Sequence, residues 1–208
     1  MFRDLSTALC AITDPSVNAT RVLCFLTLYA ALLHAQETPT EIDKETLNTI
    51  RTGFYVAVED EDTTLSLMHF IQDEFSKDHD KYPAVILAYY AALEGLRGRH
   101  ARNPVSKFVH VSNAVEKMNA AVSQDSFLLE GRFLRFSFFH QIPGVFGVGK
   151  MVAGDLEQTI SLLEKRDYGF VGKEQQKDMI GYLLDNDRLK TEQRTRLEDL
   201  LEEQEYLP

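Results

Sequence analysis

The 208-residue sequence has no tryptophan and only two cysteines, and both of these, Cys10 and Cys24, lie within the first 35 residues. If these first 35 residues are removed as a leader peptide, the remaining chain has no cysteine. Cysteine metal ligands and disulfides are then excluded, and the chain must be held together by its apolar core. Basic residues are also scarce, because 22 Lys and Arg stand against 32 Asp and Glu, which gives a formal net charge of −10. Phosphate contacts need Lys and Arg in excess, so a general nucleic-acid binder is excluded.

The motifs of common catalytic and metal sites are missing as well. The sequence contains no Gly-x-Ser-x-Gly elbow, no His-Glu-x-x-His pair and no twelve-residue calcium loop. Residues 144–150 do have the Walker A spacing, but a helix is expected before them and Met151 stands where magnesium needs Ser or Thr. We therefore expect no cofactor, no metal and no catalytic activity. A zinc site assembled from distant histidines and an enzyme with a non-obvious site stay as minor alternatives.

One apolar run, residues 22–35, follows Arg21 and ends at Ala35, where polar sequence begins. The run is 14 residues long, whereas a helix that spans a bilayer needs roughly 20. A basic residue, a short apolar stretch and a small residue at the cut are typical of a secretory signal peptide. We expect residues 1–35 to be this peptide, cleaved near Ala35, with the mature chain periplasmic or extracellular and without a membrane span. The alternatives are an uncleaved anchor and a buried first helix.

The rest of the chain, residues 36–208, is expected to form a single all-α domain, because apolar residues recur at helical spacing and strand-type alternation is absent. Pro83 and Asn103-Pro104 each mark a helix start, since proline is tolerated in the first turn. Short connections predict antiparallel hairpins. About seven to eight helices are expected, over residues 40–58, 63–75, 83–102, 103–124, 125–142, 155–166, 172–184 and 191–205.

Residues 114–125 read Ala-Val-Glu-Lys-Met-Asn-Ala-Ala-Val-Ser-Gln-Asp. Small residues at the first and eighth places, a large apolar residue at the fifth and Asp at the twelfth resemble the second helix of a tetratricopeptide repeat. The family usually has Pro after this Asp, where this chain has Ser126. The next segment continues the resemblance loosely, through Phe133, Phe136, Ser137 and His140.

This resemblance covers about a fifth of the chain, and the 43 residues from Pro83 to Ser126 exceed the repeat length of about 34. It implies helical hairpins stacked as an irregular tetratricopeptide-like α-solenoid. Such folds usually act as protein-binding scaffolds. The whole chain also resembles a group of uncharacterised exported bacterial proteins, which supplies no activity to carry over.

Charge is unevenly distributed, since residues 82–150 carry 8 basic and 4 acidic side chains whereas both flanks are acidic. Arg132 and Arg135 lie one turn apart in the most apolar helix, where an arginine needs a carboxylate or a ligand anion. Two interpretations stay open. The arginines pair internally with the flanking acidic helices, or they line a site for an anion or acidic peptide. The candidate residues for such a site are Arg132, Arg135, His140, Arg99 and Arg102.

The function expected from these patterns is an exported helical scaffold that binds another protein or peptide, with an unidentified envelope or periplasmic protein as partner. The alternative is a periplasmic protein that binds a small molecule or lipid in a pocket between the third and fifth helices. The glycine-rich loop around Val145 and Phe146 would contact a partner or a membrane if these side chains are exposed.

Overall fold

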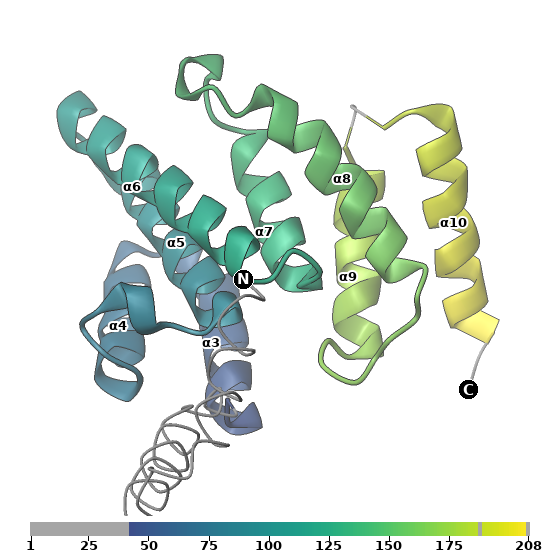
Figure 1. Cartoon of the computed structure of the whole chain (residues 1–208), viewed down its shortest axis with the longest axis horizontal. Coiled ribbons are helices and arrows are strands. Elements are labelled where there is room, and N and C mark those ends of the chain that lie inside the picture. Colours follow the sequence, from purple (N-terminus) through teal and green to yellow (C-terminus); the bar gives the residue numbers. More distant parts are fainter. Residues whose placement is uncertain (1–41, 187–188, 207–208) are drawn as a thin grey trace, which may run out of the picture. The chain divides into compact units, whose positions relative to one another are not determined.

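The computed structural model describes residues 42–186 and 189–206 (Figure 1), so the predicted signal peptide over residues 1–35 lies outside the described residues. All of the described residues belong to one compact unit. All regular structure in the described ranges is helical, which confirms the expected all-α fold with about eight helices. The α-helices are α3 (Lys44–Ala57), α4 (Glu61–Glu74), α5 (Ala84–His100), α6 (Pro104–Gln124), α7 (Leu129–Phe139), α8 (Gly149–Leu163), α9 (Lys173–Leu184) and α10 (Thr191–Tyr206), with short 3-10 helices η2 (His79–Lys81) and η3 (Gly144–Phe146).

Helix starts follow local sequence signals. The Asp60 side chain accepts a hydrogen bond from the Thr63 amide (2.7 Å), and the Asn103 side chain accepts one from the Val105 amide (2.8 Å). Each bond satisfies an amide that has no partner inside its own helix. Pro83 directly precedes α5 and Pro104 is the first residue of α6. Both proline-marked starts are therefore confirmed.

Three predicted helix starts were wrong. The first helix begins at Lys44 rather than near residue 40, because the Asp43 side chain accepts a hydrogen bond from the Thr46 amide (3.0 Å). The fifth predicted helix begins at Leu129 rather than near residue 125, because the Asp125 side chain accepts from the Phe127 amide in a turn (2.9 Å). The sixth begins at Gly149 rather than near Asp155. The glycine-rich stretch hides this start, since glycine normally indicates a loop. Val148 and Val152 are nevertheless buried one helical turn apart, and their burial holds the first turn of α8 in place.

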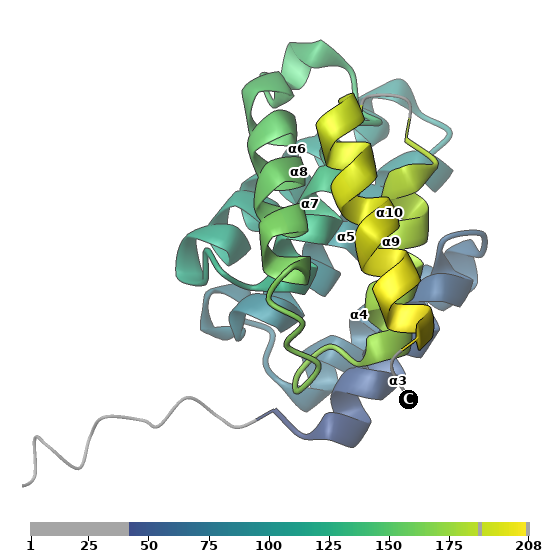
Figure 2. The ribbon, with the colours of Figure 1, turned by 90° about the vertical axis from the view of Figure 1, so that its right-hand side faces the viewer.

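The helices pack as consecutive pairs, α3 with α4, α5 with α6, α7 with α8 and α9 with α10, and Figure 1 shows the chain reversing direction within the later pairs. Helix α5 is the centre of the core, because 12 of its 17 residues are buried and it contacts α3, α4, α6 and α7. Figure 2 shows α10 lying beside α8 and α9. A helix that is apolar on most sides must pack centrally, as the composition of α5 predicted.

Candidate functional site

Arg132 and Arg135 share one buried carboxylate, that of Asp155 in α8. Arg135 donates from Nε to Oδ2 and from Nη2 to Oδ1, both at 2.7 Å, and Arg132 donates from Nη1 to Oδ1 at 2.8 Å. Asp155 is completely buried. Arg135 also donates to Asn119 Oδ1 (3.1 Å), and Arg132 donates to the Ser126 carbonyl (2.9 Å). In the structure the two arginines are therefore paired internally, as the first interpretation expected, and the pairing joins α6, α7 and α8.

The other three candidate residues lie apart from this cluster. His140 ends α7, where its Nδ1 lies 3.2 Å from the Phe136 carbonyl oxygen and its ring stacks on the Phe136 ring with centroids 5.2 Å apart. Arg99 donates two hydrogen bonds to the Glu59 carboxylate (3.0 and 3.1 Å) and one to the Val58 carbonyl (3.0 Å), which fixes the α3–α4 turn to the end of α5. Arg102 is exposed, and its side chain makes no hydrogen bond or ion pair with any described residue.

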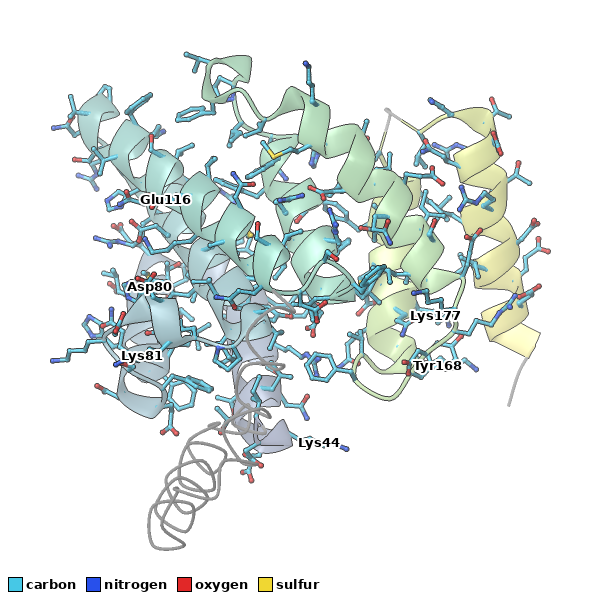
Figure 3. All side chains as sticks on the ribbon, in the orientation of Figure 1. Lys44, Asp80, Lys81, Glu116, Tyr168 and Lys177 are labelled. Carbon is cyan, nitrogen blue, oxygen red and sulfur yellow. The ribbon has the colours of Figure 1, made fainter. Side chains whose placement is uncertain are left out.

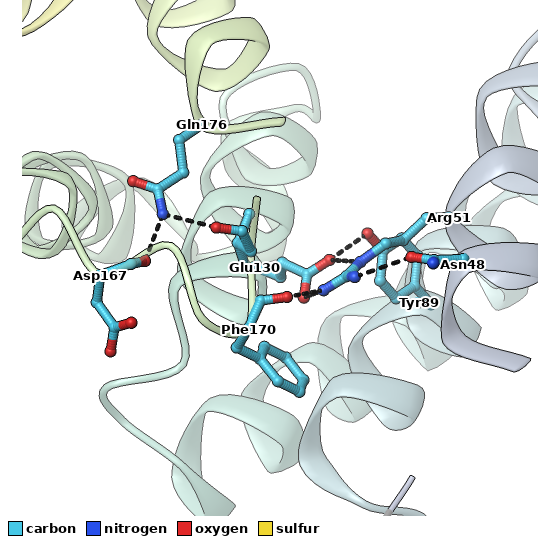
Figure 4. A network of polar contacts seen from close by, with 8 residues as sticks. Asn48, Arg51, Tyr89, Glu130, Asp167, Phe170 and Gln176 are labelled. Atoms are coloured by element: carbon cyan, nitrogen blue, oxygen red, sulfur yellow. Dashed lines mark hydrogen bonds and ion pairs between the residues drawn. The ribbon is translucent and has the colours of Figure 1, made fainter. Parts of the chain in front are cut away.

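A second buried ion pair, absent from the sequence prediction, joins Arg51 of α3 to Glu130 of α7 (Figure 4). Arg51 Nε and Nη2 donate to the two Glu130 oxygens at 2.7 and 2.6 Å, and the Tyr89 hydroxyl donates to Oε1 at 2.6 Å. Arg51 Nη2 also reaches the Phe170 carbonyl (3.0 Å). Burial raises the pKa of Tyr89 well above its usual value, so the hydroxyl stays protonated as a donor. The network ties α3, α5, α7 and the segment before α9 together.

Glu94 of α5 forms a third network at the α5–α6 contact. It is 5% exposed, and its carboxylate lies 2.9 Å from His110 Nδ1, 3.3 Å from Asn113 Nδ2 and 3.3 Å from Arg97 Nη1. Burial alone would raise the pKa of Glu94, but the hydrogen bonds from His110 and Asn113 and the charge of Arg97 bring it below its usual value. Arg97, His110 and Asn113 thus all contact Glu94, and the last two join α6 to α5 in a structural contact between the two helices.

The largest exposed apolar side chains at one end of the molecule come from two segments far apart in the sequence. In the first turns of α6, Val105, Phe108 and Val109 are 71%, 55% and 48% exposed, and Val145 in η3 is 79% exposed. The Phe108 ring stacks on the Phe146 ring, with centroids 5.2 Å apart and planes 29° from parallel. We call these five residues the apolar patch. The glycine loop around Val145 and Phe146 is a candidate contact surface on sequence grounds as well.

The site expected for a small molecule, between the third and fifth helices, corresponds to the contact between α5 and α7. That contact is tight at Gly95, where an added Cβ would lie 2.7 Å from Cε2 of Phe138. A surface hollow is found instead on one face of α3, lined by Glu45, Asn48, Thr49, Thr52 and Gly53. Its lining comes from a single helix, so it lacks the convergent polar groups of a typical ligand pocket.

Within residues 42–186 and 189–206, no group of three or more His, Cys, Asp or Glu is placed to hold a metal ion. No helix in that part of the chain is long and apolar enough to cross a membrane. Comparison with protein-family models, with curated proteins and with solved structures gives no significant match.

Proposed function

We propose that this chain is an exported, non-catalytic helical scaffold that binds another protein through the apolar patch. One observation carries the proposal: four apolar side chains that are about half exposed or more gather at one end of the fold, and the Phe108–Phe146 stack joins their two segments. Single exposed apolar residues are ordinary, but a contiguous exposed cluster is typical of an interaction site. Aromatic residues such as Phe108 are also enriched in protein interfaces.

The elements that carry the patch are held on a fixed frame, which lowers the entropy cost of binding. Helix α8 follows η3 directly, and its first turn is anchored by the buried Val148 and Val152. One turn further along α8, Asp155 is clamped by Arg132 and Arg135 of α7, and Arg135 also contacts Asn119 of α6. A left-handed backbone conformation at Gly147 (φ 69°) turns the chain between η3 and α8, a conformation that glycine adopts without strain.

The same proposal includes export and a repeat-like architecture. The leader over residues 1–35 has the composition of a signal peptide, which would place the partner in the envelope or periplasm. The four helix pairs are the units from which an irregular tetratricopeptide-like stack would be built. Support for the resemblance comes from Ala114, Met118 and Ala121, which are all fully buried, as the second helix of such a repeat requires.

The test is affinity capture from the envelope fraction of the producing cells, with quantitative mass spectrometry. The patch variant is Val105→Ser/Val145→Ser, which replaces two strongly exposed side chains and leaves the Phe108–Phe146 stack in place. The matched control is Tyr55→Ser/Val56→Ser, which replaces two exposed apolar side chains of α3. We expect one dominant protein with the wild type and the control, and a loss of roughly tenfold or more with the patch variant. Equal capture by the patch variant, or no capture by the wild type, contradicts the proposal.

Export is tested separately, by N-terminal sequencing of the mature protein. A chain that begins just after Ala35 is expected. A mature chain that still begins at Met1 contradicts the exported location and leaves the patch unaffected.

A further inference from the structure

We infer that the partner segment that covers the apolar patch is an acidic stretch of protein, an inference that rests on the proposed function. Residues 97–110 and 141–154 contribute the patch and its surroundings. Together they hold five of the 22 Lys and Arg of the chain and none of its 32 Asp and Glu. The two segments that carry the patch are therefore cationic within a strongly acidic chain, and a partner of complementary charge is favoured there.

Three of these five cations are available to a partner. Arg97 is paired with Glu94, and Arg99 is paired with Glu59. Arg102, Lys107 and Lys150 are exposed, and their side chains make no hydrogen bond or ion pair with the described residues.

The available cations border the patch directly in the sequence. Arg102 lies three residues before Val105, Lys107 directly precedes Phe108, and Lys150 lies four residues after Phe146. An apolar centre with a charged border is the usual anatomy of a protein interface.

The backbone contributes positive charge at the same end. Helix α6 begins at Pro104 and helix α8 begins at Gly149, so the amino-terminal ends of two helices lie beside the patch. The first amides of a helix have no partner within it and carry a partial positive charge. At α8 no side chain caps these amides. Carboxylates of a partner would gain from them as well as from the three cationic side chains.

An anionic bilayer would share part of this chemistry, but the side chains of the patch fit it less well. Membrane-docking surfaces carry bulky apolar residues that insert, together with Trp and Tyr at the interface. Here the most exposed residues are Val145 and Val105, the Phe108 ring is stacked on Phe146, and the chain has no Trp. The exposed carboxylates outside the two segments would also be repelled by an extended anionic surface.

The experiment places the photo-crosslinking amino acid p-benzoylphenylalanine at Val145 of the full chain, in the cells that produce it. We expect a protein adduct whose crosslinked peptide carries a net negative charge. Lys107→Glu/Lys150→Glu should lower the adduct yield by roughly tenfold or more, whereas Lys107→Arg/Lys150→Arg should retain it. The matched control reversal, Lys44→Glu/Lys177→Glu, changes two cations of α3 and α9 and should have little effect (Figure 3).

The outcomes separate this inference from the proposed function. A crosslinked peptide that is neutral or basic, with a yield unaffected by charge reversal at Lys107 and Lys150, overturns the acidic partner and retains protein binding. An adduct to lipid overturns it in favour of a bilayer surface. The absence of any adduct at Val145, together with failed affinity capture, overturns the proposed function itself.

Discussion

Both carboxylate oxygens of Asp155 accept hydrogen bonds from the guanidinium group of Arg135, at 2.7 Å each, in a site where Asp155 has no exposed surface. Such bidentate pairs are among the strongest polar contacts in proteins. Two buried charges cost much desolvation energy, so their benefit over an apolar pair is small, but removal of only one partner leaves the other uncompensated. The pair therefore makes α7 and α8 dependent on each other.

The first prediction concerns the Asp155 carboxylate. Asp155→Ala should lower the free energy of unfolding by about 3–5 kcal/mol, because Arg132 and Arg135 then lose their shared counter-charge within the fold. Urea unfolding followed by far-UV circular dichroism measures the change. Arg135→Leu/Asp155→Leu should recover much of the loss, since no charge is left unpaired at Arg135.

The control for this prediction is Asp199→Asn, which removes an exposed carboxylate of α10 without a partner among the described residues. Its unfolding curve should match the wild type. If Asp155→Ala also leaves the free energy of unfolding unchanged, the buried ion pair does not stabilise the protein.

The second prediction separates two neighbouring arginines of α10. Arg196 donates to Glu164 from Nε and Nη2 (2.7 and 2.8 Å) and to Glu157 from Nη1 (2.6 Å), whereas the Arg194 side chain has no polar partner in the described ranges. Arg196→Ala should therefore speed amide hydrogen exchange across residues 191–206, because these contacts dock α10 on α8. Arg194→Ala should leave exchange unchanged. Equal protection in both variants would show that the Arg196 ion pairs are not needed to dock α10, and that apolar packing and the contacts of Gln193 and Glu203 are sufficient.

The sequence predicted helices well where a boundary has a local cause. Pro83 and Asn103 mark the starts of α5 and α6 by backbone chemistry that acts within a few residues. Helix α8 was placed too late, because Gly149 and Gly154 favour a loop and Asp155 is a good helix cap. Tertiary contacts decide where α8 begins, because Val148 is buried in the core and Asp155, which lies within α8 rather than at its start, is paired with Arg135.

The site was less predictable, since its contacts join residues that are distant in the sequence. An arginine in an apolar helix predicts a counter-charge, which identified Arg135 as a paired or ligand-binding residue, but no pattern singles out Asp155 among 32 carboxylates. The Arg51–Glu130 pair spans 79 residues and left no local signal. Phe108 lies in the early turns of α6, where it is 55% exposed and stacks on Phe146, and that contact joins residues 38 positions apart.

The third prediction tests the close approach of α5 and α7. Gly95→Ala should lower the free energy of unfolding by about 1 kcal/mol or more, because the new Cβ would lie 2.7 Å from Cε2 of Phe138. Gly181→Ala, in the open interior of α9, should raise it by about 0.5–1 kcal/mol, since alanine loses less backbone entropy in a helix. Thermal and urea unfolding measure both. Gly95→Ala/Phe138→Leu should restore most of the loss, and a stable Gly95→Ala would show that the ring moves freely.

The fourth prediction starts from His79 in η2, whose ring packs against two tyrosines that also contact each other. Its centroid is 4.3 Å from that of Tyr90 and 5.3 Å from that of Tyr82, and its Nε2 is buried without a hydrogen-bond partner. Burial, and secondarily the charge of Lys117, lower the pKa of His79 below 6.5. Glu94, Asp78 and Asp80 oppose this shift without cancelling it. The neutral ring is thus the form that the fold prefers.

Because the pKa of His79 is lower in the folded chain than in the unfolded chain, the unfolded chain binds the proton more readily. The stabilising contribution is complete above about pH 6.5 and is lost as the pH falls through the folded pKa. The urea midpoint of the wild type should therefore fall between about pH 7 and about pH 5, and His79→Phe, which keeps an aromatic ring, should show a smaller fall. His69→Gln, at an exposed position of α4, should keep the wild-type pH dependence. The same slope in His79→Phe as in the wild type would assign the pH dependence to other groups, because carboxylates contribute equally in all three proteins.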